Sequence, residues 1–175
     1  MKGWIIDAQL GADGTSMDVW MFVEGQGVRQ LVVPWCASIH IHSAKSRLQN
    51  LMQWLEYPEV RTRFSVGAMR FIRRRLSLDQ YEMHDVLEID MIDSRKIRQL
   101  ANHIESRGDF HRYTLYSVDA HLAQRFFVEY NVAPFQYVEW NNSQFTVLEE
   151  SANWPELSHL KMDFTYDSVD GFDTI

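Results

Sequence analysis

Arginines are concentrated in one stretch of the chain, between residues 61 and 75, which contains no carboxylate. Guanidinium groups form paired hydrogen bonds with phosphate oxygens, so this run predicts contact with a nucleic-acid backbone. The alternative is a solvated surface that is balanced by acidic neighbours, because charge runs are common and the formal net charge is −7. The arginines of the run are Arg61, Arg63, Arg70, Arg73, Arg74 and Arg75.

Two histidines, His40 and His42, would project from one face of a strand. Such a pair can ligate zinc, but structural zinc sites use four ligands, and no cluster of Cys or His supplies the others. We therefore expect no metal site in this chain. The single cysteine, Cys36, excludes an internal disulfide, favours a reducing compartment and is expected to be a small core residue.

The bulk composition is that of an ordinary globular protein. The chain has 175 residues, of which 46% are hydrophobic and 23% charged, so it fits one domain or a domain plus a tail. No run of about 18 apolar residues is present, so we expect no membrane span and a cytoplasmic protein. The acidic net charge argues against a surface that binds nucleic acid everywhere, and it leaves room for a local basic face.

An antiparallel meander should open the chain. Alternating or β-branched residues predict strands over 4–10, 17–23 and 28–33, and Asp-Gly and Gly-Gln-Gly sequences mark the turns between them. Strands are also expected over 36–42, 60–66, 81–89 and 112–118. Between them, Ser43 would cap a helix that runs to Trp54, and Asp93 or Ser94 would cap a helix that runs to Ser106.

This order of strand, helix, strand, strand, helix, strand is the ferredoxin-like order, with both helices on one face of an antiparallel sheet. The segment 67–76, between the two middle strands, is expected to be a short helix or an irregular basic arm. The fold class is therefore α+β: a meander plus a ferredoxin-like β-α-β-β-α-β unit, followed by a helix and a short hairpin.

The stretch from Tyr113 to Phe135 organises this arrangement. Tyr113 to Val118 predicts a buried strand, and Asp119 is a good N-cap for the helix that follows. That helix has an apolar face, made of Leu122, Phe126, Phe127 and Tyr130. Asn131 fits a left-handed helix end. Beyond Pro134, residues 136–140 and 144–148 predict a hairpin around Asn141-Asn142-Ser143.

The order of these motifs resembles the end of the N-terminal domain of family B DNA polymerases, archaeal and bacterial. The matching residues are Tyr116, Asp119, Gln124-Arg125-Phe126 and Pro134-Phe135, together with Val33-Pro34-Trp35. The resemblance covers about residues 3 to 165. It implies a template-binding N-terminal domain over 1–135, a hairpin and linker over 136–159, and the first strand of a truncated exonuclease domain over 160–175.

The same resemblance implies a function. The domain would contact the single-stranded DNA template and scaffold the remaining domains of the polymerase. Archaeal members of the family use the arginine that matches Arg125, with a Pro-Tyr pair, to shape a pocket for template uracil. This chain departs from them at Ala8, where an aromatic residue is usual, and at His121 and Leu122, where they have Pro-Phe. Met83 would lie near a position at which they have a valine. The alternative is that Arg125 and Trp35 pack and pair within the domain. The expected template contacts are Arg125, Trp35, Pro34, Arg70, Arg73, Arg74 and Arg75.

No complete catalytic site is expected here. Asp163-Phe164-Thr165 lies where the family has the Asp-Ile-Glu exonuclease motif, and Thr165 cannot replace the second metal-binding carboxylate. Asp163 is then a degenerate remnant of the motif, or another register lets Asp167 contribute. The alternative is an acidic residue on an ordinary strand. The nucleotidyltransferase reaction, with its Mg²⁺, would belong to the parent polymerase. Two other functions stay open: a stand-alone single-strand-binding ferredoxin-like module, and a degenerate polymerase relative that mediates protein contacts.

Overall fold

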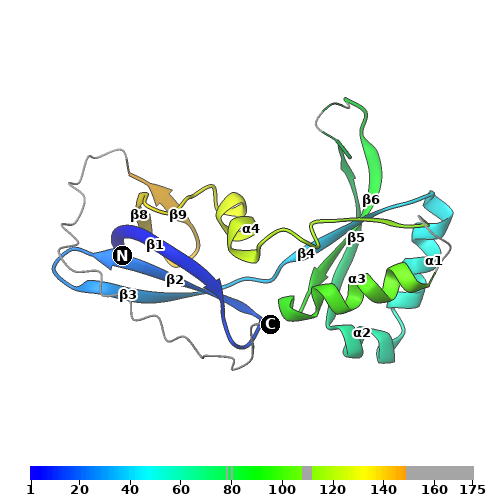
Figure 1. Ribbon diagram of the computed structural model, residues 1–175, viewed down its shortest axis with the longest axis horizontal. Coiled ribbons are helices and arrows are strands. Elements are labelled where there is room, and N and C mark those ends of the chain that lie inside the picture. The colour runs from blue at the N-terminus through cyan, green and yellow to red at the C-terminus, as the bar shows by residue number, and fades with distance from the viewer. Residues whose placement is uncertain (78, 80, 108–111, 149–175) are drawn as a thin grey trace, which may run out of the picture.

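The protein contains two antiparallel sheets (Figure 1). The computed structural model describes residues 1–148 except 78, 80 and 108–111. The first sheet has five strands in the order β3-β2-β1-β8-β9. Their bounds are β1 Lys2–Leu10, β2 Ser16–Val23, β3 Gly27–Pro34, β8 Tyr137–Trp140 and β9 Phe145–Val147. The expected meander and hairpin are both confirmed, and β8 pairs with β1, so that the hairpin extends the meander.

The second sheet has four strands in the order β5-β6-β4-β7. This is the ferredoxin-like arrangement, so the expected fold class is confirmed. The strands are β4 Ser38–His42, β5 Val66–Arg74, β6 His84–Met91 and β7 Thr114–Tyr116. The helices of this unit are α1 Lys45–Leu55, α2 Pro58–Phe64, a 3-10 turn at Ser94–Lys96 and α3 Ile97–Ser106.

Residues 60–64 form most of helix α2, so the strand expected over 60–66 is wrong. Pro58 occupies the first turn, where its fixed φ favours a helix. Val60 and Phe64 then lie four residues apart on the buried side of the helix, and the same spacing imitates strand alternation. Ser65 ends the helix with a left-handed φ of 53°. The segment expected to be a helix or irregular arm is instead strand β5, whose pairing with β6 shifts register between Val66 and Met69.

Two of the expected helix caps are also wrong. Ser43 Oγ donates to the carbonyl of Arg112 at 2.6 Å, and Ala44 is the N-cap of α1. Helix α4, Leu122–Glu129, begins after His121, and Asp119 makes no cap. Asp93 does cap its turn, because its Oδ1 accepts from the backbone N–H of Arg95 at 3.0 Å.

The remaining features of this region agree in part. The strand expected over 113–118 is shorter than predicted and only half-buried, because β7 is an edge strand. Asn131 has the left-handed φ expected at a helix end, 52°.

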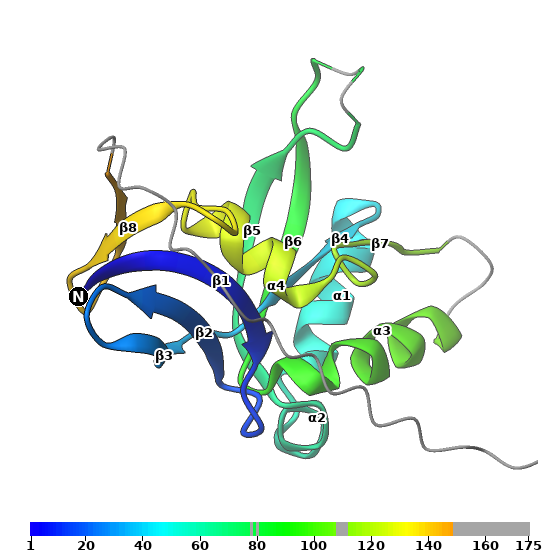
Figure 2. The same cartoon turned by 60° about the vertical axis from the view of Figure 1, so that its left-hand side comes forward.

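The core lies between each sheet and its helices. Helices α1 and α3 cover one face of the four-stranded sheet, where Leu48 and Leu100 are fully buried with Ile39 and Ile89 (Figure 2). Helix α4 lies between the two sheets in both views. Its Phe126 is fully buried and contacts the rings of Trp35 and Phe145. The other face of the four-stranded sheet carries the polar side chains that form the candidate site.

Candidate functional site

A row of polar residues crosses the four-stranded sheet on the face away from α1 and α3. Arg70 of β5 pairs in register with Glu88 of β6, which pairs with His40 of β4, which in turn pairs with Tyr116 of β7. Residues opposite one another in a sheet project to the same side, so the four side chains share one face. Hydrophobic neighbours such as Ile39 project to the helices instead.

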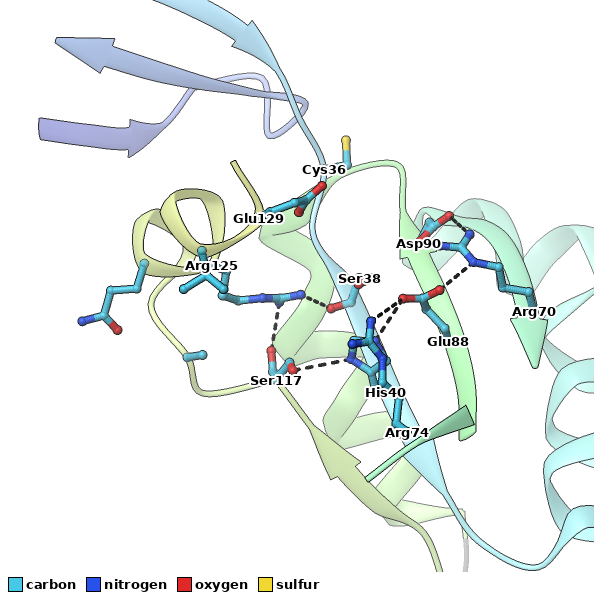
Figure 3. Close-up of a pocket in the computed structure, with 13 residues that line it drawn as sticks. Cys36, Ser38, His40, Arg70, Arg74, Glu88, Asp90, Ser117, Arg125 and Glu129 are labelled. Carbon is cyan, nitrogen blue, oxygen red and sulfur yellow. Dashed lines mark hydrogen bonds and ion pairs between the residues drawn. The ribbon is translucent and has the colours of Figure 1, made fainter. Parts of the chain in front are cut away.

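Glu88 is the centre of this row. Its side chain is only 8% exposed, and its carboxylate lies 2.6 Å from Arg70 Nε, 3.0 Å from His40 Nε2 and 3.9 Å from Arg74 Nη2 (Figure 3). Arg70 also binds Asp90, at 2.6 Å. A buried carboxylate needs such partners, because an unpaired charge is costly away from water. Arg70 is therefore committed to two carboxylates, although it was expected to contact the template.

Burial lowers the pKa of His40 against the opposing effect of Glu88, which favours the neutral imidazole near pH 7. A carboxylate only accepts, so Nε2 carries the proton, and Nδ1 accepts from Ser117 Oγ at 3.5 Å. The order Ser117, His40, Glu88 is that of a nucleophilic relay. The long Ser117–His40 distance and the arginines on Glu88 instead suit a structural hydrogen-bond chain.

Arg125 extends from α4 toward the same sheet. Its Nη1 donates to the carbonyl of Ser117 at 2.9 Å, and its Nη2 donates to the carbonyl of Ser38. Ser117 has a left-handed φ of 64°, which turns the chain at the end of β7. Burial lowers the pKa of the Arg125 guanidinium, though it stays charged. The side chain predicted to contact template thus joins α4 to β4 and to the turn after β7.

Trp35 lies beside α4 and is 6% exposed. Its Nε1 donates to Glu129 Oε2 at 2.8 Å, and its ring meets Phe126 edge-on at 5.9 Å. Pro34 is exposed at the end of β3. In this structure the indole is a packing group, as the alternative interpretation expected, and base stacking by Trp35 stays a prediction.

The basic run is divided among three places. Arg61 and Arg63 lie on α2, where Arg61 Nη2 donates to the carbonyl of Gly67 at 2.8 Å. Arg70 and Arg74 lie on the polar face of β5. Arg73 points to the opposite side of the same strand.

The β5–β6 hairpin extends beyond the rest of its sheet (Figure 2). Arg73 Nη2 donates to the carbonyl of Met83 at 3.2 Å, and the Arg75 guanidinium lies 5.5 Å from the centre of the exposed Tyr81 ring. Met83 therefore belongs to this hairpin, and it does not line the pocket beside Arg125.

A pocket of about 670 Å³ brings the polar face and α4 together. Of the predicted site residues, Arg70, Arg74 and Arg125 line it, whereas Pro34, Trp35, Arg73 and Arg75 do not. Cys36 also lines it and is partly exposed, so its expected place in the core is wrong. Burial, followed by nearby aspartates, raises the pKa of its thiol, which disfavours the nucleophilic thiolate. Sequence reasoning missed Glu88 and Asp90, whose spacing of two within a strand places both on one face.

Comparisons with protein-family models and with curated proteins find no match. Among solved structures, the chain is similar to the family B DNA polymerase from the hyperthermophilic archaeon Pyrobaculum calidifontis. The TM-score is 0.55 and the sequence identity 16%, over 79% of this chain and 17% of the polymerase. The fold is polymerase-like. The chain spans about a sixth of that polymerase, so the likeness concerns one part of a larger architecture.

Several expectations concern residues that the structure does not describe. Asp163, the possible exonuclease remnant, lies outside the described residues, as do residues 149–159 of the expected linker and the strand expected in the segment 160–175. Within the described part of the chain, no group of three or more His, Cys, Asp or Glu side chains could hold a metal ion. No helix there is long and apolar enough to cross a membrane.

Proposed function

We propose that this chain is the N-terminal-type domain of a family B DNA polymerase, which holds the single-stranded template and scaffolds the other domains. The observation that carries the proposal is the fold shared with the archaeal polymerase over 79% of the chain. The order of sequence motifs between Val33 and Phe135 supports the same assignment independently of the fold. Polymerase chemistry and its Mg²⁺ belong, in this proposal, to other domains of the parent protein.

The template contact is assigned to the β5–β6 hairpin. Its arginines Arg73, Arg74 and Arg75 are exposed, and their partners in the described structure are a carbonyl, a carboxylate 3.9 Å away and an aromatic ring. Arg70, by contrast, makes two ion pairs at 2.6 Å. Loosely held guanidinium groups can exchange these partners for phosphate oxygens, which Arg binds in a bidentate manner.

The decisive experiment is a titration of the full chain with a single strand of DNA at several salt concentrations. Replacing Arg73, Arg74 and Arg75 together with Ala should weaken binding and flatten its salt dependence, by about 0.7 in log–log slope for each lost phosphate contact. Arg29→Ala, an exposed arginine on β3, is the matched control and should change neither quantity appreciably. An unchanged slope in the triple variant would remove the hairpin from the template path.

Uracil sensing is the finer part of this proposal. A pocket of about 390 Å³ lies beside the start of α4, lined by Gln9 and Leu10 of β1, by Ser94, Arg95, Ile97 and Arg98, and by residues 118–123. Support for uracil sensing is limited to His121 and Leu122: of the residues that the resemblance associates with the base pocket, these two line it, whereas Arg125, Pro34, Trp35 and Ala8 do not. Matched strands with one uracil or one thymine test it, since a retained pocket would give tighter binding of the uracil strand. Equal affinities would leave a template-binding domain without base selection.

A further inference from the structure

A second, smaller hollow opens next to the main pocket on the same face of the four-stranded sheet. Its volume is about 200 Å³. The hollow shares His40, Arg74 and Ser117 with the main pocket, so the two are contiguous. The described residues that line it are His40, Arg74, Arg75, Leu76, Val86, Tyr116 and Ser117.

The charges of the two cavities differ. The main pocket has Arg70, Arg74 and Arg125 balanced by Glu88, Asp90 and Glu129. Among the residues that the structure describes, the lining of the hollow has two arginines and no carboxylate. This difference gives the hollow an excess of positive charge in a recess, where the local potential is strengthened by the surrounding protein.

In the described part of the chain, neither arginine of the hollow has partners for all of its N–H groups. Arg74 is 60% exposed and lies 3.9 Å from Glu88, a carboxylate that Arg70 already contacts at 2.6 Å. Arg75 has a ring contact with Tyr81 at 5.5 Å. Each guanidinium therefore retains N–H donors for a ligand, and Tyr116, which also lines the hollow, carries a hydroxyl that can donate.

From this arrangement we infer that the hollow is a phosphate-binding subsite, with Arg74 and Arg75 as its cationic donors. Phosphate oxygens accept such charge-assisted hydrogen bonds, and the planar guanidinium matches their geometry. The apolar side chains of Leu76 and Val86 would lie against the sugar or another uncharged part of the ligand. The inference deepens the proposed function and rests on it where the phosphate comes from a template strand.

Two sources of phosphate share this chemistry: a phosphodiester within a single strand, and a terminal or free phosphate. NMR spectra of the side-chain Nε–H groups of arginine distinguish them in the full chain, with signals assigned by Arg74→Gln, Arg75→Gln and Arg29→Gln. The probes are a short thymidine strand with a 5′-hydroxyl, the same strand with a 5′-phosphate, and inorganic phosphate. We expect the Arg74 and Arg75 signals to shift and the Arg29 signal to stay. Arg74→Gln should weaken binding roughly fivefold, an effect limited by the exposure of this side chain.

The outcomes separate the subsite from the proposed function. A shift with the 5′-hydroxyl strand supports the subsite with a phosphodiester ligand. A shift only with the 5′-phosphate strand or inorganic phosphate supports the subsite with a terminal phosphate. Strand binding that leaves both signals unmoved overturns the subsite while template binding stands. Absence of strand binding, with both signals moved by inorganic phosphate, supports the subsite and overturns template binding.

Discussion

Arg125 illustrates how a residue chosen for a ligand can serve the fold. Its guanidinium donates to the carbonyls of Ser38 and Ser117, which belong to separate parts of the chain. Arg125→Ala leaves both carbonyls without this donor, so we expect the free energy of unfolding to fall by about 3 kcal/mol. Urea denaturation of the full chain measures this loss.

Two further variants test the geometry rather than the charge. Arg125→Lys keeps the charge but cannot present two N–H groups in a fixed fork, so it should recover less than half of the loss. Gln124→Ala changes the exposed neighbour and should alter stability by less than about 0.5 kcal/mol. Equal stability of Arg125→Ala and Gln124→Ala would show that the two carbonyl contacts contribute little.

The sequence identified Arg125 and Trp35 but not their partners. A motif can single out an arginine, whereas carbonyl oxygens occur at every residue and leave no signal in the sequence. Similarly, an aromatic residue after a strand suits either base stacking or core packing. Here Glu129 and Phe126 of α4 cover the indole, and only the tertiary structure brings them beside it.

At the scale of elements, helix α2 ends in a conformation that favours glycine. Ser65 has φ 53° and ψ 46°, the left-handed region, which is costly for a residue with a Cβ. Ser65→Gly relieves this strain, and we expect it to raise the free energy of unfolding by about 0.5 kcal/mol after the extra flexibility of unfolded glycine is subtracted. The carbonyl of Ser65 still accepts from Ile92 N–H, at 2.7 Å.

Thr62→Gly, inside α2, is the matched control. Glycine there should cost roughly 0.3 kcal/mol, because it is a poorer helix former than threonine and the position lies inside the helix. Thermal and urea unfolding compare the two variants directly. If both are destabilised alike, the Ser65 side chain contributes more than its backbone strain costs.

Patterns of period two were reliable where a strand is half-buried and misleading where a helix is short. The second strand of the meander was predicted from alternating residue types, and β2 does alternate buried Val19 and Met21 with partly exposed Trp20. In α2, Val60 and Phe64 satisfy both periods, and seven residues are too few to separate them. The caps predicted at Ser43 and Asp119 were wrong because the helices begin later, after Ala44 and His121. The local sequence does not fix the residue at which these helices start.

At the scale of the whole molecule, α4 joins the two sheets. The rings of Phe126 and Trp35 meet at 5.9 Å, Phe126 also contacts Phe145 of β9, and Arg125 reaches Ser38 of β4. The hairpin β8–β9 follows residue 135 in the chain, yet it lies in the sheet of β1. These contacts place one continuous set of buried side chains across both sheets.

Such a shared core predicts that both sheets unfold together. Phe126 is fully buried, so Phe126→Ala should lower the free energy of unfolding by about 3–5 kcal/mol through lost contacts and a cavity. Tryptophan fluorescence can follow each part in variants that keep one reporter: Trp20 for the five-stranded sheet, or Trp54, which stacks on His103, for the helices of the other sheet. With Phe126 present, both reporters should give the same unfolding midpoint. In the Phe126→Ala variant the midpoint should be lower and again the same for both reporters.

Phe126→Leu provides the control for this coupling, because it keeps an apolar side chain in the space between the sheets and should cost less than the change to Ala. If Phe126→Ala lowers the unfolding midpoint reported by Trp20 alone, α4 stabilises only the five-stranded sheet. If it lowers both midpoints by the same amount, α4 couples the stability of the two sheets. Since Arg125 and Glu129 of the same helix line the main pocket, this coupling would also tie the shape of that pocket to the packing of Phe126.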